Sequence, residues 1–83
     1  MYKVRIERKV QKNIDKILEP YYSKVKISIL NLAVNPRPHG CKKLKDRNAY
    51  RIRVGIYRII YEIFDDILLV DVIEFGHRKD IYK

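Results

Sequence analysis

The sequence predicts a single small α+β domain: a strand, a helical hairpin and then an antiparallel meander that completes one sheet. Two segments with apolar residues at helical spacing come first, and three β-rich runs separated by short turn signals follow them. No internal repeat or interdomain linker interrupts residues 1–83, so one domain is expected. With two helices available to cover a sheet, both are expected on the same face.

The N-terminal half predicts one strand and two helices. Alternating apolar and charged residues predict a strand at 2–6, which must add to an edge of the sheet or pair with the last strand. An apolar stripe over 7–18 predicts a helix that ends at Pro20. A second helix is predicted for 20–34, because proline is tolerated in the first turn of a helix. The two helices are expected to form a tight antiparallel hairpin.

A loop rich in proline and glycine separates the helices from the sheet. This loop is NPRPHG, residues 35–40. After it we expect a short strand or extended lead-in at 41–44 and a turn at 46–48. The remainder is predicted to form hairpins from three strands, at 49–54, 56–64 and 67–75.

Three arginines alternate with apolar and aromatic residues in the stretch AYRIRVGIYRIIY, residues 49–61. With Val54 and Gly55 as the turn of this hairpin, Arg51 lies opposite Arg58. All three cations then share one face of the sheet, and the helices pack on the other. We call this surface the arginine face, and its cations are Arg51, Arg53 and Arg58.

Like charges set opposite each other on a sheet repel, so the arginine face needs a counter-charge. Guanidinium groups bind phosphate oxygens in pairs, which suits contact with a nucleic-acid backbone. A network in which Glu62 and Asp71 neutralise the arginines is the alternative, and both interpretations stay open. The face is also expected to carry apolar residues that the helices leave uncovered, unless the C-terminal tail or the loop 35–40 folds over them: Ile60, Phe64, Leu69, Ile73 and Phe75.

The charge balance predicts a polyanionic partner. Nineteen Lys and Arg against ten Asp and Glu give a net charge of +9. No run approaches the ~20 apolar residues that span a bilayer, and the N-terminus lacks the apolar stretch of a signal peptide. A cytoplasmic protein with no membrane partner is therefore expected. Metal-ligand spacing, a phosphate-binding glycine loop and a nucleophile motif are all missing from the sequence, so no metal or cofactor is predicted.

The C-terminal tail FGHRKDIYK, residues 75–83, supplies groups that can move protons. His77 can act as an acid or base near neutral pH, whereas Tyr82 needs nearby cations to lower its pKa from about 10. In RNA the attacking group can be the substrate's own 2′-hydroxyl. Metal-independent cleavage then needs only orientation, proton transfer and charge stabilisation at the phosphate.

With these residues in view, the chain resembles the RelE toxins of the RelE/ParE superfamily, which are ribosome-dependent mRNA endonucleases of toxin-antitoxin pairs. The resemblance covers essentially the whole chain. It rests on the order of elements, on NPRPHGCKKLKDRNAYRIRVG and YRIIYEI, and on the ending FGHRKDIYK. It implies a RelE-like fold, cleavage of mRNA in the ribosomal A site by 2′-hydroxyl attack on the adjacent phosphate, and inhibition by a cognate antitoxin. Promoter DNA is expected as a partner only through the antitoxin complex.

Carried over by motif position, the resemblance assigns the catalytic residues. Arg58 and Arg78 match arginines that contact the scissile phosphate and stabilise the transition state. Tyr82 matches the C-terminal tyrosine, which stacks on a base or joins in proton transfer. His77 occupies the position before the second arginine, where a basic residue or histidine is common.

The resemblance also assigns the residues that hold RNA. Arg51 and Arg53 match the pair of basic strand residues placed against the mRNA, and Lys43 and Lys45 complete the predicted RNA-binding set. The best-known relatives have lysines in place of the two arginines. Because arginine does not readily give up its proton, we expect these arginines to act as electrostatic clamps and the tail to supply the base.

Two other functions are compatible with the same residues. A ParE-like inhibitor of DNA gyrase shares the fold and needs no catalytic set. A degenerate toxin, retained only as an antitoxin or DNA-complex partner, is the third possibility. In the toxin interpretations, the cationic chain with an uncovered apolar face predicts a small, acidic and partly disordered antitoxin that folds on binding.

Overall fold

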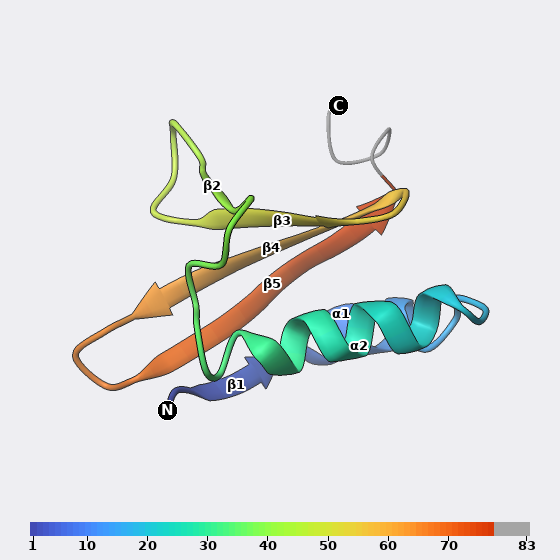
Figure 1. The fold of residues 1–83 in the computed structure, drawn as a ribbon, viewed down its shortest axis with the longest axis horizontal. Helices are drawn as coiled ribbons and strands as arrows, with labels where there is room; N and C mark the ends of the chain where they lie inside the picture. Colours follow the sequence, from blue (N-terminus) through green and yellow to red (C-terminus); the bar gives the residue numbers. More distant parts are fainter. Residues whose placement is uncertain (78–83) are drawn as a thin grey trace.

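A five-stranded sheet carries two helices on one of its faces in the computed structural model, which describes residues 1–77 (Figure 1). The predicted α+β class, with both helices on the same face of a single sheet, is confirmed. In chain order the elements are β1 (Lys3–Ile6), α1 (Arg8–Ile14), α2 (Tyr21–Asn31), β2 (Lys42–Lys43), β3 (Tyr50–Val54), β4 (Tyr57–Phe64) and β5 (Leu69–His77).

Both helices are shorter than predicted, and each ends in a tightened turn. α1 ends at Ile14, and the backbone amides of the next residues bond three positions back in a tightened turn. Pro20 disfavours the helical conformation only at the residue before it, Glu19, and α1 ends well ahead of that position. Leu18, expected on the inner stripe, is consequently 81% exposed. α2 likewise loosens after Asn31, ahead of Pro36.

The strands lie in the order β1-β5-β4-β3-β2. The first strand pairs with the last, which is one of the two placements left open by the sequence, and the pairing is parallel, which makes the sheet mixed. The other neighbours are antiparallel. β4 therefore lies at the centre of the sheet, with the arginine-bearing β3 beside it.

The hairpin between β3 and β4 turns at Gly55 and Ile56, one position later than predicted. Gly55 has φ of +60°, a conformation that glycine adopts without strain in such turns. Moving the turn by one residue moves the pairing by two, so the expected pairing of Arg51 with Arg58 is wrong and Arg53 lies opposite Arg58. Because side chains alternate with a period of two, the three arginines still share one face, as predicted.

A bulge interrupts the pairing of β4 with β5. Ile60 pairs with Glu74, but the next residue, Tyr61, pairs with Val72, which leaves Ile73 as the extra residue. The bulge reverses the faces of the following β5 residues. Phe75, which follows the bulge and was expected on the arginine face, therefore turns toward the helices.

The connection between β4 and β5 is also longer than predicted. It spans residues 65–68, and Leu68 has φ of 52°. A turn at 65–66 predicts Phe64 opposite Ile67, Glu62 opposite Leu69 and Ile60 opposite Asp71. These pairs are wrong, because Phe64 lies opposite Leu69, Glu62 opposite Asp71 and Ile60 opposite Glu74.

The hydrophobic core fills the space between the helices and the helix face, which we define as the face opposite the arginines. Phe75 packs against this core, so its predicted place on the arginine face is wrong. Ile60 does lie on the arginine face, but it is 3% exposed and forms no open apolar surface there. The buried core residues are Val10, Ile14, Val25, Ile29, Leu32, Ile52, Ile59, Tyr61, Ile63, Val70 and Val72.

Candidate functional site

The arginines of the arginine face differ in their exposure. Arg53 is exposed, Arg51 is half-buried and Arg58 is 3% exposed. Arg58 lies between Arg53 on β3 and Gly76 on β5, and the glycine has no side chain to compete for the space. A guanidinium group keeps its charge when buried, and its field is screened less there than in water. Arg58 therefore places a buried cation between β3 and β5 on the arginine face.

β2 adds a lysine that the sequence analysis missed. Lys42 lies opposite Arg51 and so shares the arginine face, whereas Lys43, the predicted RNA-binding residue, lies opposite Tyr50 and shares the helix face. Lys45 is exposed in the bend that follows. The alternation of side chains along β3 could not be extended back to Lys42, because the residues between β2 and β3 form a loop and do not alternate between the two faces.

Carboxylates also lie on the arginine face, at the side of the sheet nearer β1. Asp71 Oδ1 lies 4.0 Å from Nε of Arg5 on β1. Glu74 Oε1 lies 2.8 Å from Nη1 of Arg47, in the loop between β2 and β3. These ion pairs link the face to distant parts of the chain. The charge of the face therefore changes from basic near the Gly55 turn to mixed near β1.

The tail is described only as far as His77. This residue ends β5 opposite Tyr57, on the helix face. The two rings are arranged edge to face, with their centroids 6.3 Å apart. Tyr57 also stacks on Phe75 at 5.2 Å. The structure thus does not bring His77 onto the face of Arg58. The predicted catalytic residues Arg78 and Tyr82 lie outside the described residues.

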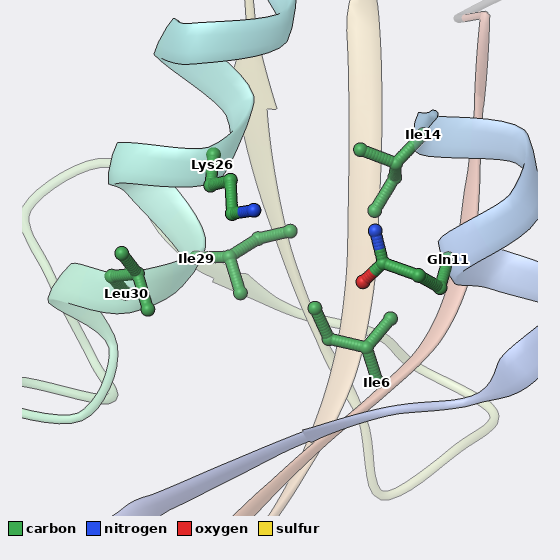
Figure 2. Close-up of a pocket in the computed structure, with 6 residues that line it drawn as sticks. All are labelled: Ile6, Gln11, Ile14, Lys26, Ile29 and Leu30. Atoms are coloured by element: carbon green, nitrogen blue, oxygen red, sulfur yellow. The ribbon is translucent and has the colours of Figure 1, made fainter. Parts of the chain in front are cut away.

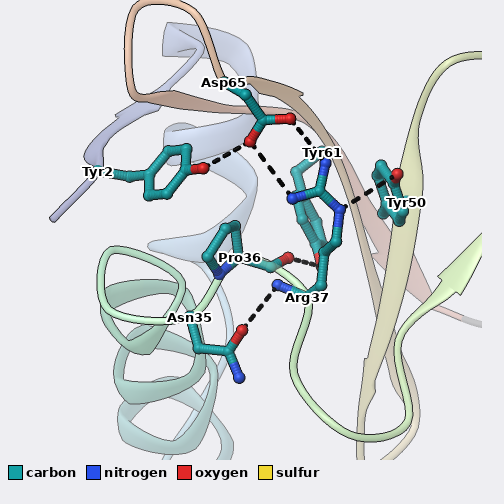
Figure 3. Close-up of polar contacts among 7 residues, drawn as sticks. All are labelled: Tyr2, Asn35, Pro36, Arg37, Tyr50, Tyr61 and Asp65. Atoms are coloured by element: carbon teal, nitrogen blue, oxygen red, sulfur yellow. Dashed lines mark hydrogen bonds and ion pairs between the residues drawn. The ribbon is translucent and has the colours of Figure 1, made fainter.

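A polar cluster fastens the loop 35–40 to the helix face (Figure 3). Arg37 donates hydrogen bonds to both carboxylate oxygens of Asp65, at 3.3 and 2.9 Å, and Tyr2 donates another to the same carboxylate. Arg37 also lies over the ring of Tyr50, and the buried Tyr61 hydroxyl donates to the carbonyl of Pro36 at 2.8 Å. The alternative in which this loop covers the arginine face is therefore wrong.

The same contacts shift the ionisation of the cluster. Hydrogen bonds from Arg37 and then Tyr2 lower the pKa of Asp65, and the bond to Asp65 raises the pKa of Tyr2. Burial raises the pKa of Tyr61 well above its usual range. At neutral pH the Asp65 carboxylate is thus charged and able to hold Arg37.

Acid is expected to loosen this cluster. Because the folded-state pKa of Asp65 is lowered, its contribution to stability is complete above the ordinary carboxyl pKa of about 4 and is lost as pH falls through the folded value. Asp65→Asn should lower the melting temperature at pH 7, and the difference from wild type should shrink between about pH 5 and pH 3. Asp66→Asn, in the same turn, is the matched control. A difference that stays constant with pH would contradict the assignment.

The helix layer presents apolar surface of its own. A hollow of about 40 Å³ lies between the helices and β1 (Figure 2). Leu30 lines it and is mostly exposed, as are Ile27 and Val34 nearby in the sequence. The hollow is lined by Ile6, Gln11, Ile14, Lys26, Ile29 and Leu30.

Metal and membrane sites are not apparent in the described part of the chain. Within residues 1–77 no three His, Cys, Asp or Glu side chains are grouped so that they could hold a metal ion. Neither of the two described helices has the length and apolarity needed to cross a membrane.

Known structures share this fold. A chain of the archaeal RelE-RelB complex from Pyrococcus horikoshii OT3 matches with a TM-score of 0.84 and 24% identity, over 93% of this chain and 94% of that one. A chain of the RelB-RelE antitoxin-toxin complex from Methanococcus jannaschii matches with a TM-score of 0.75 and 26% identity, over 95% of both chains. A chain of the intact E. coli RelBE toxin-antitoxin complex matches with a TM-score of 0.80 and 22% identity, over 93% of this chain and 96% of that one. The architecture is that of the RelE-type toxins.

Residues 4–82 match the family model of the ParE toxin of the type II toxin-antitoxin system, parDE. No curated protein sequence is detectably similar to the chain. Because the family model spans nearly the whole chain, this protein belongs to the ParE toxin family and, with its RelE-like fold, to the RelE/ParE superfamily. It is a toxin of a type II toxin-antitoxin system.

Proposed function

We propose that this toxin is a metal-independent endoribonuclease that cleaves mRNA in the ribosomal A site. The observation that carries the proposal is the buried Arg58 on a sheet face that also bears Arg51, Arg53 and Lys42. A row of cations around one desolvated guanidinium group suits a phosphate whose negative charge grows during cleavage. A surface that only attracts a polyanion would not require a buried arginine.

The proposed reaction uses the 2′-hydroxyl of the RNA as the nucleophile. It attacks the adjacent phosphate, the bond to the 5′-oxygen of the next nucleotide breaks, and a 2′,3′-cyclic phosphate forms. Arg58 stabilises the charge on the phosphate, while Arg51 and Arg53 position the backbone. We assign proton transfer to Tyr82 rather than His77, since His77 lies on the helix face. We assign Arg78 as the second residue that binds the phosphate.

The proposed regulator is a small, acidic and partly disordered antitoxin. The exposed apolar side chains of the helix layer, Ile27, Leu30 and Val34, offer a surface for an amphipathic segment, and the net charge of +9 favours an acidic one. The similar structures from Pyrococcus horikoshii and Methanococcus jannaschii are toxin-antitoxin complexes. Promoter DNA would be reached only through that complex.

Inhibition of DNA gyrase without catalysis is the second candidate. The match to the ParE family model favours it. This function needs a binding surface but no group that stabilises a phosphate in reaction. Assays that report RNA cleavage and DNA supercoiling separately distinguish the two.

The decisive experiment adds purified toxin to ribosomes translating a defined mRNA and, separately, to a gyrase supercoiling reaction. We expect a toeprint at an A-site codon and unchanged supercoiling. A 2′-O-methyl group on the attacking nucleotide should abolish cleavage, because it removes the nucleophile. Arg78→Ala should abolish it on the unmodified mRNA. Inhibited supercoiling with intact mRNA would establish the gyrase function instead.

A further inference from the structure

An ion pair ties the loop between β2 and β3 to β5 across the arginine face. Arg47 Nη1 donates to Glu74 Oε1 at 2.8 Å, and both side chains remain partly exposed, at 45% and 42%. The two residues are 27 positions apart in the sequence. The contact therefore exists because the sheet and the loop bring them together.

The ion pair spans a row of residues that runs across four strands. Lys42 lies opposite Arg51, Arg51 opposite Ile60, and Ile60 opposite Glu74. The loop that carries Arg47 rises on the side of the sheet away from the helices (Figure 1). Arg47 meets Glu74 at the β5 end of this row, and Ile60, which lies between Arg51 and Glu74 in it, is 3% exposed.

We propose that Arg47 is a further phosphate-binding residue, and that Glu74 holds its guanidinium group until an RNA phosphate displaces the carboxylate. The inference rests on the proposed function, since it needs RNA on the arginine face. Carboxylate and phosphate offer a guanidinium group the same arrangement of oxygens. An exposed ion pair contributes little stability, so a phosphate that also meets Lys42 and Arg51 can replace Glu74.

A purely structural role for the pair leads to a different expectation. If Arg47 and Glu74 only hold the loop, removing either partner loosens it, and both changes weaken RNA binding. If Glu74 competes with RNA for Arg47, removing the carboxylate strengthens binding and removing the arginine weakens it. The signs of the two effects therefore separate the roles.

The test measures fluorescence anisotropy of the full chain with a labelled single-stranded RNA that is 2′-O-methylated throughout, so that it is not cleaved. Between about 50 and 200 mM salt, Arg47→Gln should weaken binding and reduce the salt dependence by about 0.7 in log-log slope. Glu74→Gln should tighten binding about two- to fivefold. Asp66→Asn makes the same charge change away from the row and should have a smaller effect.

The double variant Arg47→Gln/Glu74→Gln completes the test. Glu74→Gln should lose most of its effect in the Arg47→Gln background, because Glu74 acts through Arg47. Weaker binding by both single variants, or an undiminished effect of Glu74→Gln in that background, would overturn the exchange while leaving the RNA-binding face in place. Wild-type protein that fails to bind the RNA at about 50 mM salt would overturn the exchange, whereas the RNase proposal is decided separately by the toeprinting assay on ribosomes.

Discussion

Replacing Arg58 by alanine is expected to lower mRNA cleavage by about a hundredfold or more, because it removes the desolvated charge that the proposed reaction uses to stabilise the phosphate. The fold should survive with a lowered melting temperature, since Arg58 is not in the hydrophobic core cluster but its buried side chain leaves a cavity when truncated. The measurement is cleavage in the toeprinting assay, together with growth arrest on induction. Arg8→Ala makes the same charge change on an exposed position of α1 and should leave both readouts unchanged.

A second substitution at this position separates charge from geometry. Arg58→Lys keeps the cation but loses the planar pair of donors, so intermediate activity is expected. Thermal unfolding of each variant shows whether lost activity reflects lost structure. Full toxicity of a folded Arg58→Ala protein would contradict the proposed role.

Replacing the next residue, Ile59, by alanine is expected to affect folding instead. Its side chain is completely buried on the helix face, opposite Ile52 and Phe75. Removing it should cost about 2 to 5 kcal/mol, a large part of the ~5 to 15 kcal/mol that stabilises a small domain. The measurement is urea unfolding, with a lower midpoint and an unchanged slope.

The control for this prediction is Ile56→Ala, in the exposed turn of the same hairpin. Its unfolding free energy should change by less than about 0.5 kcal/mol. Folded Ile59→Ala protein at low temperature should still cleave mRNA, since the arginine face is retained. An Ile59→Ala midpoint equal to that of Ile56→Ala would show that this position is not part of the core.

The face of the arginines was predictable, but their partners were not. Alternation with a period of two assigns Arg51, Arg53 and Arg58 to one face whenever the turn moves by a whole residue, since the pairing then shifts by two. Which residue lies opposite Arg58 depends on the turn itself. The structure places the turn at Gly55 and Ile56, and the sequence did not distinguish it from a turn one residue earlier.

The bulge and the loops account for most of the remaining differences. An extra residue in β5 moved Phe75 to the core and Glu74 to the arginine face, and a bulge has no clear signature in apolar alternation. The place of Lys42 beside Arg51 depends on how the chain returns after the loop 35–40. Roles for Arg78, Tyr82 and His77 stay predictions.

The sequence by itself determined the α+β class, the order of elements, the shared face of three arginines and the resemblance to RelE toxins, because these follow from local periodicity and motif order. Only the tertiary structure decided that Arg58 is buried, that Lys42 joins it and that Arg47 reaches Glu74 across the sheet. Burial and pairing between distant residues depend on how strands and loops are placed in space. Local alternation in AYRIRVGIYRIIY does not contain that information.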